Sequence, residues 1–250
     1  MVDTKFSTKI TRLTEKDRVK TFVKGLDDRL EGGVPKNSVV LVAGKAGSMK
    51  SSFCFSIIYN QALQEGQRGV YISLEQNRQS LLEHMIGLGM DVTEMDNIII
   101  VDLGKLRKVV HGSEGQTTKR IDWMETLRTQ LRSYKETFGC SICVIDSLPA
   151  LYTLSKFDSL RAELFHFFES LRDLKMTTFL VSEVASQGES EFGTYEVESF
   201  LSDGIVHLDM EREERAVNLF MGIVKMRKTN HERGYFPLIF DKDGFELVKT

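Results

Sequence analysis

The chain of 250 residues has little cysteine, little proline and no long apolar run. Its three cysteines, Cys54, Cys140 and Cys143, are too few for a disulfide framework. Cys140 and Cys143 form a C-x-x-C pair, but no second pair or histidine cluster completes a zinc site, so we expect structural thiols. No apolar run approaches the ~20 residues that span a bilayer, and the first residues lack the apolar region of a signal peptide. We therefore expect a cytoplasmic protein with no membrane partner.

Neither sign of charge dominates the sequence. There are 33 lysine and arginine residues against 36 aspartate and glutamate residues, which gives a formal net charge of −3. This balance provides no overall attraction to nucleic acid or to an anionic membrane. With 41% hydrophobic residues and three prolines, the composition is that of a soluble globular protein without an interdomain linker. We expect a polar arm over residues 1–20 and a single domain over residues 21–250.

A glycine-containing turn lies between two apolar segments. Residues 39–42 read Val-Val-Leu-Val, as in a strand buried on both faces, and residues 52–64 repeat apolar side chains at helical spacing. A strand that leads directly into a helix points free backbone N–H groups and the positive end of the helix dipole at one spot, where a phosphate binds. The predicted phosphate-binding loop consists of Gly44, Lys45, Ala46, Gly47, Ser48, Met49, Lys50, Ser51 and Ser52.

The side chains of this loop suit a nucleoside triphosphate. Lys50 is placed to reach the terminal phosphates, and the Ser51 hydroxyl is placed to bind Mg²⁺. Met49 stands where the usual pattern has glycine. A side chain is tolerated there if residue 49 keeps a helical conformation, because methionine enters positive φ less readily than glycine. The alternative interpretation is an ordinary glycine-rich turn with a solvated lysine.

Two later strands are predicted to end in an acidic residue beside this loop. Residues 69–74 complete a βαβ unit, so their strand runs parallel to the first and carries Glu75 at its carboxyl end. Glu75 is placed to orient or deprotonate an attacking water, or it is only an acid in the first turn of the helix expected from Asn77. Residues 141–147 form another apolar strand, and its Asp146 is placed to hold Mg²⁺.

The other segments predict further layers of an α/β fold. Two more strands are marked by apolar runs at residues 97–101 and 176–181. Three more helices are expected, at residues 77–88, 120–138 and 157–175. The C-terminal part contains four short runs with turn signals, which predict antiparallel strands added to one edge of the parallel sheet. These four runs cover residues 204–208, 216–226, 235–240 and 244–248.

Two expected loops carry an excess of one charge. Residues 104–119 are basic and contain three glycines. They either bind a partner or nucleic acid or form a solvated excursion, which is favoured because no aromatic residue is interleaved for base stacking. Residues 187–199 contain four glutamates, which oppose DNA contact at that segment. Ser182 and Glu183, at the end of a predicted strand, either sense the γ-phosphate or cap a helix.

Taken together, these segments resemble the RecA-superfamily ATPases, and within them the KaiC-like and RadA-like branch. The opening T-x-x-x-G-L-D-x-x-L-x-G-G-V-P-K-N, from Thr21, is similar to the segment that precedes that family's phosphate loop, and G-K-A-G-S-M-K-S-S is similar to the loop itself. Y-I-S-L-E resembles the strand that ends in the catalytic glutamate, here Glu75. C-V-I-D-S-L resembles the second nucleotide motif, with Asp146 in the metal role. K-M-R-K-T-N-H resembles the closing part of KaiC-like domains.

The resemblance implies a RecA-like P-loop NTPase fold, with a mostly parallel sheet flanked by helices and antiparallel strands at its C-terminal edge. It also implies a Mg²⁺-dependent ATPase that hydrolyses ATP at the subunit interfaces of a homo-oligomer, with a hexamer-like ring favoured. Lys225 and Arg227 would reach the nucleotide of the neighbouring subunit as a finger supplied in trans, and Thr229 and His231 match positions near that nucleotide. Without the resemblance, these basic residues would be interpreted as solvated.

Two positions depart from the family pattern and would weaken turnover. Met49 replaces a glycine, and Gln76 stands where KaiC-like proteins usually have a second glutamate. Only one RecA-like unit is present, so a tandem arrangement is not implied. Two other functions stay open. One is a nucleotide-dependent assembly or signalling switch with negligible hydrolysis, and the other is a DNA-dependent recombination-type ATPase, favoured only by the basic residues 104–119. A protein client is expected, of a kind that the sequence does not specify.

Overall fold

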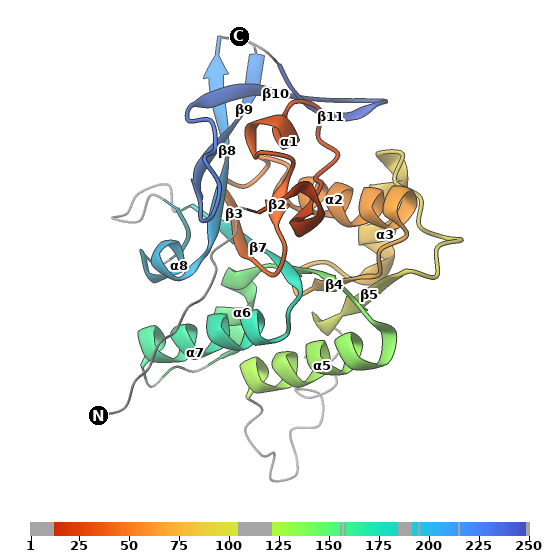
Figure 1. Cartoon of the computed structure of the whole chain (residues 1–250), viewed down its shortest axis with the longest axis vertical. Coiled ribbons are helices and arrows are strands. Elements are labelled where there is room, and N and C mark those ends of the chain that lie inside the picture. The colour runs from red at the N-terminus through yellow and green to blue at the C-terminus, as the bar shows by residue number, and fades with distance from the viewer. Residues whose placement is uncertain are drawn as a thin grey trace.

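A nine-stranded sheet with helices on both faces organises the chain (Figure 1). The computed structural model describes residues 13–104, 122–155, 157, 159–184, 192–194, 196–214 and 216–248. The strands of the sheet are β3 (Val39–Gly44), β4 (Gly69–Ser73), β5 (Ile98–Asp102), β6 (Ile142–Asp146), β7 (Thr177–Glu183), β8 (Gly204–Glu213), β9 (Ala216–Met226), β10 (Tyr235–Asp241) and β11 (Gly244–Leu247). Their order across the sheet is β11-β10-β9-β8-β3-β7-β6-β4-β5.

Helices and one small ribbon complete the described fold. The helices are α1 (Leu26–Arg29), α2 (Lys50–Glu65), α3 (Arg78–Gly87), α5 (Trp123–Phe138), α6 (Leu148–Leu154), α7 (Leu160–Asp173) and α8 (Glu196–Leu201). A 3₁₀ turn, η1 (Glu15–Asp17), leads into β1 (Arg18–Val19), which pairs with β2 (Val34–Pro35). Residues 13–20, the described part of the expected arm, therefore pack on the domain. Residues 1–12 of that arm, residues 105–119 of the expected basic loop and the first two residues of the helix expected at 120–138 lie outside the described residues.

The centre of the sheet is parallel and buried on both faces. β3 pairs in parallel with β7 and β8, and β4 pairs in parallel with β5 and β6. Every residue of β3, β4 and β6 is buried, as expected for strands with helices on both sides. This arrangement confirms the predicted fold class.

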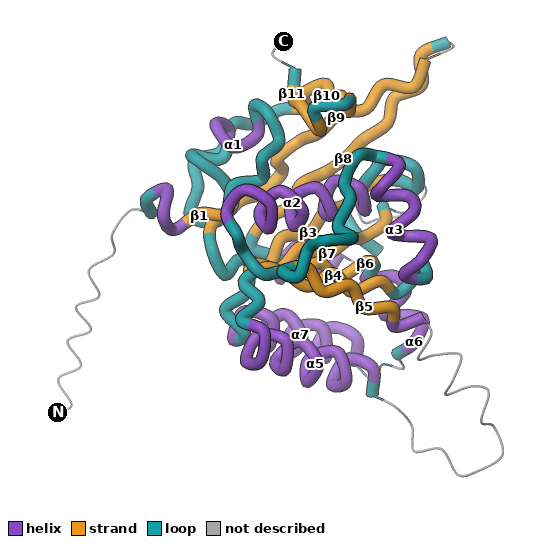
Figure 2. Tube along the Cα trace, turned by 90° about the vertical axis from the view of Figure 1, so that its right-hand side faces the viewer, coloured by secondary structure: helices purple, strands orange, loops and turns teal. Residues whose placement is uncertain are grey.

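Side chains alternate between two cores, one on each face of the sheet. Val40 and Val42 of β3 pack with α1, α2 and α3, whereas Val39 and Leu41 pack with α5, α6 and α7. Figure 2 shows α5 and α7 side by side on one face and α2 on the other. Of the helices that the structure describes, none is long and apolar enough to cross a membrane.

The C-terminal edge of the sheet is antiparallel, with one difference from the prediction. β9 pairs antiparallel with both β8 and β10, and β10 with β11. However, β8 runs parallel to β3, so the antiparallel extension begins at β9. The short run at residues 204–208 could not distinguish these directions, because a strand's own residues do not specify the direction of its partner.

Two short helices were not predicted. α6 begins one residue after Ser147, with Pro149 in its first turn, where proline is tolerated because its missing N–H is not needed. α8 lies partly within the expected acidic loop, so that prediction is wrong for residues 196–199. Its Val197 and Leu201 pack against the core on the α7 face. A helix of six residues is too short for apolar periodicity to mark it.

Asp203 ties three elements together between α8 and β8. Its carboxylate accepts hydrogen bonds from the Val39 backbone N–H (3.0 Å), from Arg172 Nε on α7 (3.1 Å) and from Arg227 Nη1 beyond β9 (2.9 Å). Burial raises the pKa of Asp203, but these three donors outweigh burial and hold the pKa below the ordinary value of 3.8. The ionised carboxylate therefore stabilises the folded state.

Replacing this carboxylate is expected to destabilise the fold in a pH-dependent way. Because the folded-state pKa is depressed, the contribution is full above the ordinary pKa and is lost as the pH falls through the folded-state pKa. We expect Asp203→Asn to lower the free energy of unfolding in urea by about 1–3 kcal/mol at pH 7, and by less near pH 3. Asp173→Asn, at an exposed position on α7, is the control. An equal loss at both pH values would contradict this role.

Candidate nucleotide-binding site

A cleft of about 370 Å³ opens where β4, β6 and β7 end, beside the start of α2. Residues from the loop 46–52 form one wall, and Glu75, Asp146 and Glu183 approach from the ends of these three strands. All three strands run parallel to β3 or to its neighbours, so their carboxyl ends meet at one edge of the sheet. The structure thus brings together the loop and both acids that the sequence singled out.

Close packing explains one glycine of the loop, and backbone conformation explains the other. A Cβ added to Gly44 would lie 2.3 Å from the Leu208 carbonyl oxygen of β8, so no side chain fits at the end of β3. Gly47 has φ of +85°, a conformation that glycine adopts without steric cost. Within the loop, the Ser48 hydroxyl and the Lys50 ammonium both donate to the Lys45 carbonyl oxygen, each at 2.8 Å. The loop is therefore folded back over the beginning of α2.

Met49 has a left-handed backbone conformation, with φ of 64° and ψ of 22°. A helical conformation was expected for a side chain at this position, and the structure differs from that expectation. Met49 is the residue before the first turn of α2, and its carbonyl accepts the helical hydrogen bond from Phe53 N (2.9 Å). The methionine side chain packs partly against the core. That packing offsets part of the left-handed strain.

Lys50 is the cation that faces the acids of the cleft. Its side chain is buried, and burial lowers the pKa of its ammonium, while the carboxylates of Glu183, Asp146 and Glu75 oppose the shift. When all groups are ionised, one positive charge faces three negative charges. Such a cleft needs further positive charge before it holds a polyphosphate.

Asp146 is held by the Tyr71 hydroxyl at the end of β6. Tyr71 Oη donates to its carboxylate. Burial raises the pKa of Asp146, and the side chains of Tyr71 and Ser51 lower it, so that the net direction is upward. Ser51 and Asp146 together present hard oxygen ligands of the kind that Mg²⁺ prefers. The donor set fits the predicted metal.

Glu75 is exposed at the rim of the same cleft. The Ser147 hydroxyl, which directly follows Asp146, donates to the Glu75 carboxylate. This bond links the acid at the end of β4 to the end of β6. Farther along the rim, Glu183 faces the cleft, whereas Ser182 is fully buried and does not line it. Of that pair, only Glu183 is available to a ligand, because neighbouring side chains of a strand point to opposite faces.

Besides Gly44 and Ser48 of the loop, five predicted binding residues do not line this cleft in their own chain. Lys45 is half exposed, and its Nζ lies 3.7 Å from Asp209 Oδ1 on β8. The others lie toward the opposite edge of the sheet. Lys225 of β9 pairs with Ile205 of β8, and Ile205 pairs with Leu41 of β3. Leu41 lies three residues before Gly44, so Lys225 is displaced by about 10 Å along the strands from the level of the phosphate loop. Arg227, Thr229 and His231 follow beyond the end of β9.

Several side chains of the site were not found from the sequence. These are Tyr71 and Ser147, which hold the two acids, and His84 of α3, whose Nε2 lies 3.3 Å from Ser52 Oγ. Tyr71 carried a usable signal, since a tyrosine within a buried strand needs a partner for its hydroxyl. Ser147 and His84 carried none, because only tertiary packing brings them to the cleft.

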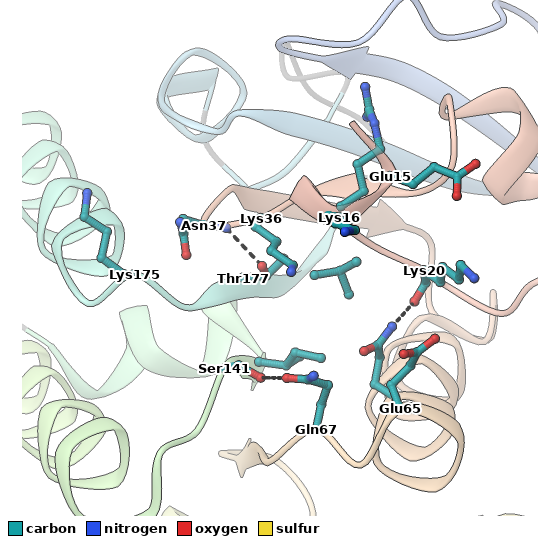
Figure 3. A pocket seen from close by; sticks show the side chains of 14 residues that line it. Glu15, Lys16, Lys20, Lys36, Asn37, Glu65, Gln67, Ser141, Lys175 and Thr177 are labelled. Atoms are coloured by element: carbon teal, nitrogen blue, oxygen red, sulfur yellow. Dashed lines mark hydrogen bonds between the residues drawn. The ribbon is translucent and has the colours of Figure 1, made fainter. Parts of the chain in front are cut away.

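A second cleft, of about 290 Å³, lies at the amino ends of β3, β6 and β7 (Figure 3). No residue of the loop 44–52 lines it. Near it are the last turn of α2, with Glu65, and four lysines, namely Lys16, Lys20, Lys36 and Lys175. Positive charge beside the carboxyl end of a helix is favourable.

Comparison with known proteins identifies the family. A family model described as "ATPase: KaiC" matches residues 19–250. The chain belongs to the KaiC ATPase family. Membership of an ATPase family supports nucleotide binding in the cleft of this KaiC-type domain, and it confirms the resemblance that the motifs indicated.

Relatives of the domain are similar over most of its length. Circadian clock protein KaiC3 of Synechocystis is 28% identical over 242 residues, which are 93% of this chain and 46% of KaiC3. The chain thus spans about half the length of that relative. A UPF0273 protein of Pyrobaculum aerophilum is 31% identical over 236 residues, 92% of this chain and 82% of that protein. The crystal structure of a KaiC-like protein from Pyrococcus horikoshii superposes with a TM-score of 0.77 at 24% identity, over 93% of this chain and 99% of that one, and shows the same fold.

The strain at Met49 can be measured by comparing two substitutions. Met49→Ala and Met49→Gly both remove the packing of the methionine side chain, but only glycine removes the Cβ from a left-handed backbone. We expect Met49→Gly to be more stable than Met49→Ala by about 0.5–1 kcal/mol in urea unfolding, after the greater flexibility of unfolded glycine is included. An alanine variant as stable as the glycine variant would show that position 49 is unstrained.

Proposed function

We propose that this KaiC-type domain is a Mg²⁺-dependent ATPase that hydrolyses ATP at the interfaces of a homo-oligomer. One observation carries the proposal: the loop at the start of α2 and the acids Glu75 and Asp146 converge on one cleft. The amides of the loop and the α2 dipole attract phosphate, and the strand ends supply the acid groups that hydrolysis requires. The matching family supports the ATPase class.

Each side chain of the cleft has a role in this reaction. Lys50 leaves the Lys45 carbonyl, which it contacts at 2.8 Å, and pairs with the β- and γ-phosphates. Glu75 orients a water molecule for in-line attack on the γ-phosphorus and takes up its proton. The new bond joins the water oxygen to phosphorus, and the bond from phosphorus to the β-phosphate oxygen breaks, which yields ADP and inorganic phosphate.

Ser51 and Asp146 are the residues that would hold the metal. Bound Mg²⁺ would neutralise charge on the β- and γ-phosphates. Ser51 lies in the first turn of α2, and both side chains line the same cleft, so their oxygens are available to one ion. Tyr71 keeps the carboxylate in this orientation through its own hydrogen bond.

The charge of the cleft supports a contribution from a neighbouring subunit. One ammonium faces three carboxylates, and a nucleoside triphosphate adds further negative charge. Lys225 and Arg227 do not line the cleft of their own chain, so as nucleotide ligands they must act on a second copy. Delivered across an interface, both cations would offset the charge that develops on the γ-phosphate, as a finger in trans does. Thr229 and His231 would lie near the same nucleotide.

Two variants separate binding from turnover. We expect Glu75→Ala to lower steady-state phosphate release by at least about 100-fold, because the attacking water loses its orienting base, while calorimetry shows ATP affinity close to that of the wild type. Lys50→Ala is expected to abolish measurable ATP binding. Glu65→Ala, at the far end of α2, is the matched control and should change neither quantity. Unchanged turnover in Glu75→Ala would remove this residue from the mechanism.

The wild-type protein also distinguishes the proposal from a nucleotide-dependent switch. Met49 and Gln76 depart from the family pattern, which makes slow hydrolysis a specific expectation. Phosphate release over hours is compared with the oligomeric state, measured by light scattering with and without ATP and Mg²⁺. Assembly with ATP but no phosphate release would replace the ATPase by a switch, and stimulation of phosphate release by DNA at low salt would indicate the recombination-type activity.

A further inference from the structure

The segment that follows β9 has no apolar anchor of its own. Met226 and Phe236 are buried, but every residue between them is exposed or only half-buried. These residues include the turn 228–232, which carries Thr229 and His231. A polar segment of this length would sample many conformations unless specific contacts restrict it. The contacts that hold it therefore determine where its side chains lie.

The two cations before the turn rest on their own chain. Lys225 Nζ donates to the carbonyl oxygens of Ser199 and Ser202, at 2.8 and 2.7 Å, beside the end of α8. Arg227 pairs with Asp203 at 2.9 Å. These contacts are made by the ends of long side chains, which exchange partners without movement of the backbone. The backbone beyond residue 227 is held in a different way.

Arg18 holds one side of the turn from β1. Its side chain is only 2% exposed. Nη1 donates to Thr229 Oγ1 at 2.9 Å, and also to the carbonyl oxygens of Leu30 and Gly33, each at 3.0 Å. Nη2 forms an ion pair with Glu31 at 2.9 Å. The guanidinium is thus fixed on the α1–β2 segment, and it makes two contacts with the turn, because Nη2 also donates to the Lys228 carbonyl oxygen at 3.5 Å.

Arg29 holds the other side of the turn from α1. Its Nε lies 3.1 Å from the Glu232 carboxylate, and its backbone carbonyl accepts from the Glu232 N–H, also at 3.1 Å. The guanidinium carbon lies 4.2 Å from the centre of the Phe236 ring, and Nη1 donates to the Gly25 carbonyl. The side chain is 8% exposed. Both arginines therefore approach the turn from a rigid, buried position.

We propose that Arg18 and Arg29 form a clamp that positions the turn 228–232, and with it the trans-acting side chains of the segment, against the nucleotide of a neighbouring subunit. This inference rests on the proposed function. Both are positioning residues: neither lines the cleft of its own chain, and each acts through Thr229 or Glu232. The clamp also gives the residues before the phosphate loop a role in catalysis by the next subunit, because it joins β1 and α1 to the end of β9.

Mixing of subunits tests the clamp. Arg18→Lys keeps the charge but loses the planar donor set. We expect its turnover number to fall at least about tenfold through misplacement of the finger, with the KM for ATP little changed. Such a subunit has an intact cleft. Added Glu75→Gln subunits, which have a disabled cleft but an intact turn, should therefore restore turnover at the Arg18→Lys clefts. Absence of restoration would overturn the positioning role.

A second variant covers the case in which Arg18→Lys does not fold. Glu232 is 54% exposed, so Glu232→Gln weakens the Arg29 side of the clamp without disturbing the core. It should show the same loss of turnover and the same restoration. Glu246→Gln removes a carboxylate 3.6 Å from Lys24, elsewhere on the same sheet, and is the matched control that should behave as the wild type. Wild-type behaviour of Glu232→Gln would overturn the proposal whether or not Arg18→Lys folds.

Hydrogen exchange without nucleotide separates the clamp from the proposed function. Amides of residues 228–232 should exchange at least about tenfold faster in Glu232→Gln than in the wild type and in Glu246→Gln. Unchanged exchange would mean that the arginines do not hold the turn. If the wild type releases no phosphate, the proposed ATPase fails, whereas the exchange rates still decide whether the clamp exists.

Discussion

One ammonium among three carboxylates is the constraint on which the rest of the site depends. Lys50 faces Glu75, Asp146 and Glu183 in a cleft where burial already disfavours its charge. In this environment negative charge is in excess, so a polyphosphate requires positive charge from other sources. The loop amides and the α2 dipole supply part of it. Under the proposed function, Mg²⁺ at Ser51 and Asp146 and the cations of a second subunit supply the remainder.

The direction of each strand determines which side chains lie at the edge of the sheet that carries the phosphate loop and which lie at the opposite edge. Because β3, β4, β6 and β7 are parallel, their carboxyl ends place the loop and the acids at one edge. β9 runs in the opposite direction, so it carries Lys225 and Arg227 toward the other edge. The same arrangement that assembles the cleft keeps these two cations away from it. This separation is why the proposed mechanism needs a neighbouring copy.

Polar contacts hold the edge of the sheet where β9 ends. Asp203 joins β3, α7 and the end of β9, and the arginines at positions 18 and 29 hold the turn beyond it. The residues that hold this edge come from positions far apart in the sequence. The edge therefore depends on the whole fold rather than on local structure.

The sequence by itself determined the features that depend on neighbouring residues. The buried strands, the turn at 44–52 and the acids at the strand ends follow from apolar runs, glycine positions and the rules for βαβ units, and the structure has them within a few residues. It also determined the fold class, because alternating strands and helices have few ways to bury both faces of a sheet.

The positive φ of Met49, the short α6 and α8, and the direction of β8 depend on neighbours from elsewhere in the chain. Only the tertiary structure decided that Tyr71 and Ser147 hold the acids, that Lys225 and Arg227 lie away from their own cleft, and that Arg18 and Arg29 hold the turn. These are contacts between residues tens to hundreds of positions apart, and no local spacing encodes a contact that forms only when the sheet is assembled.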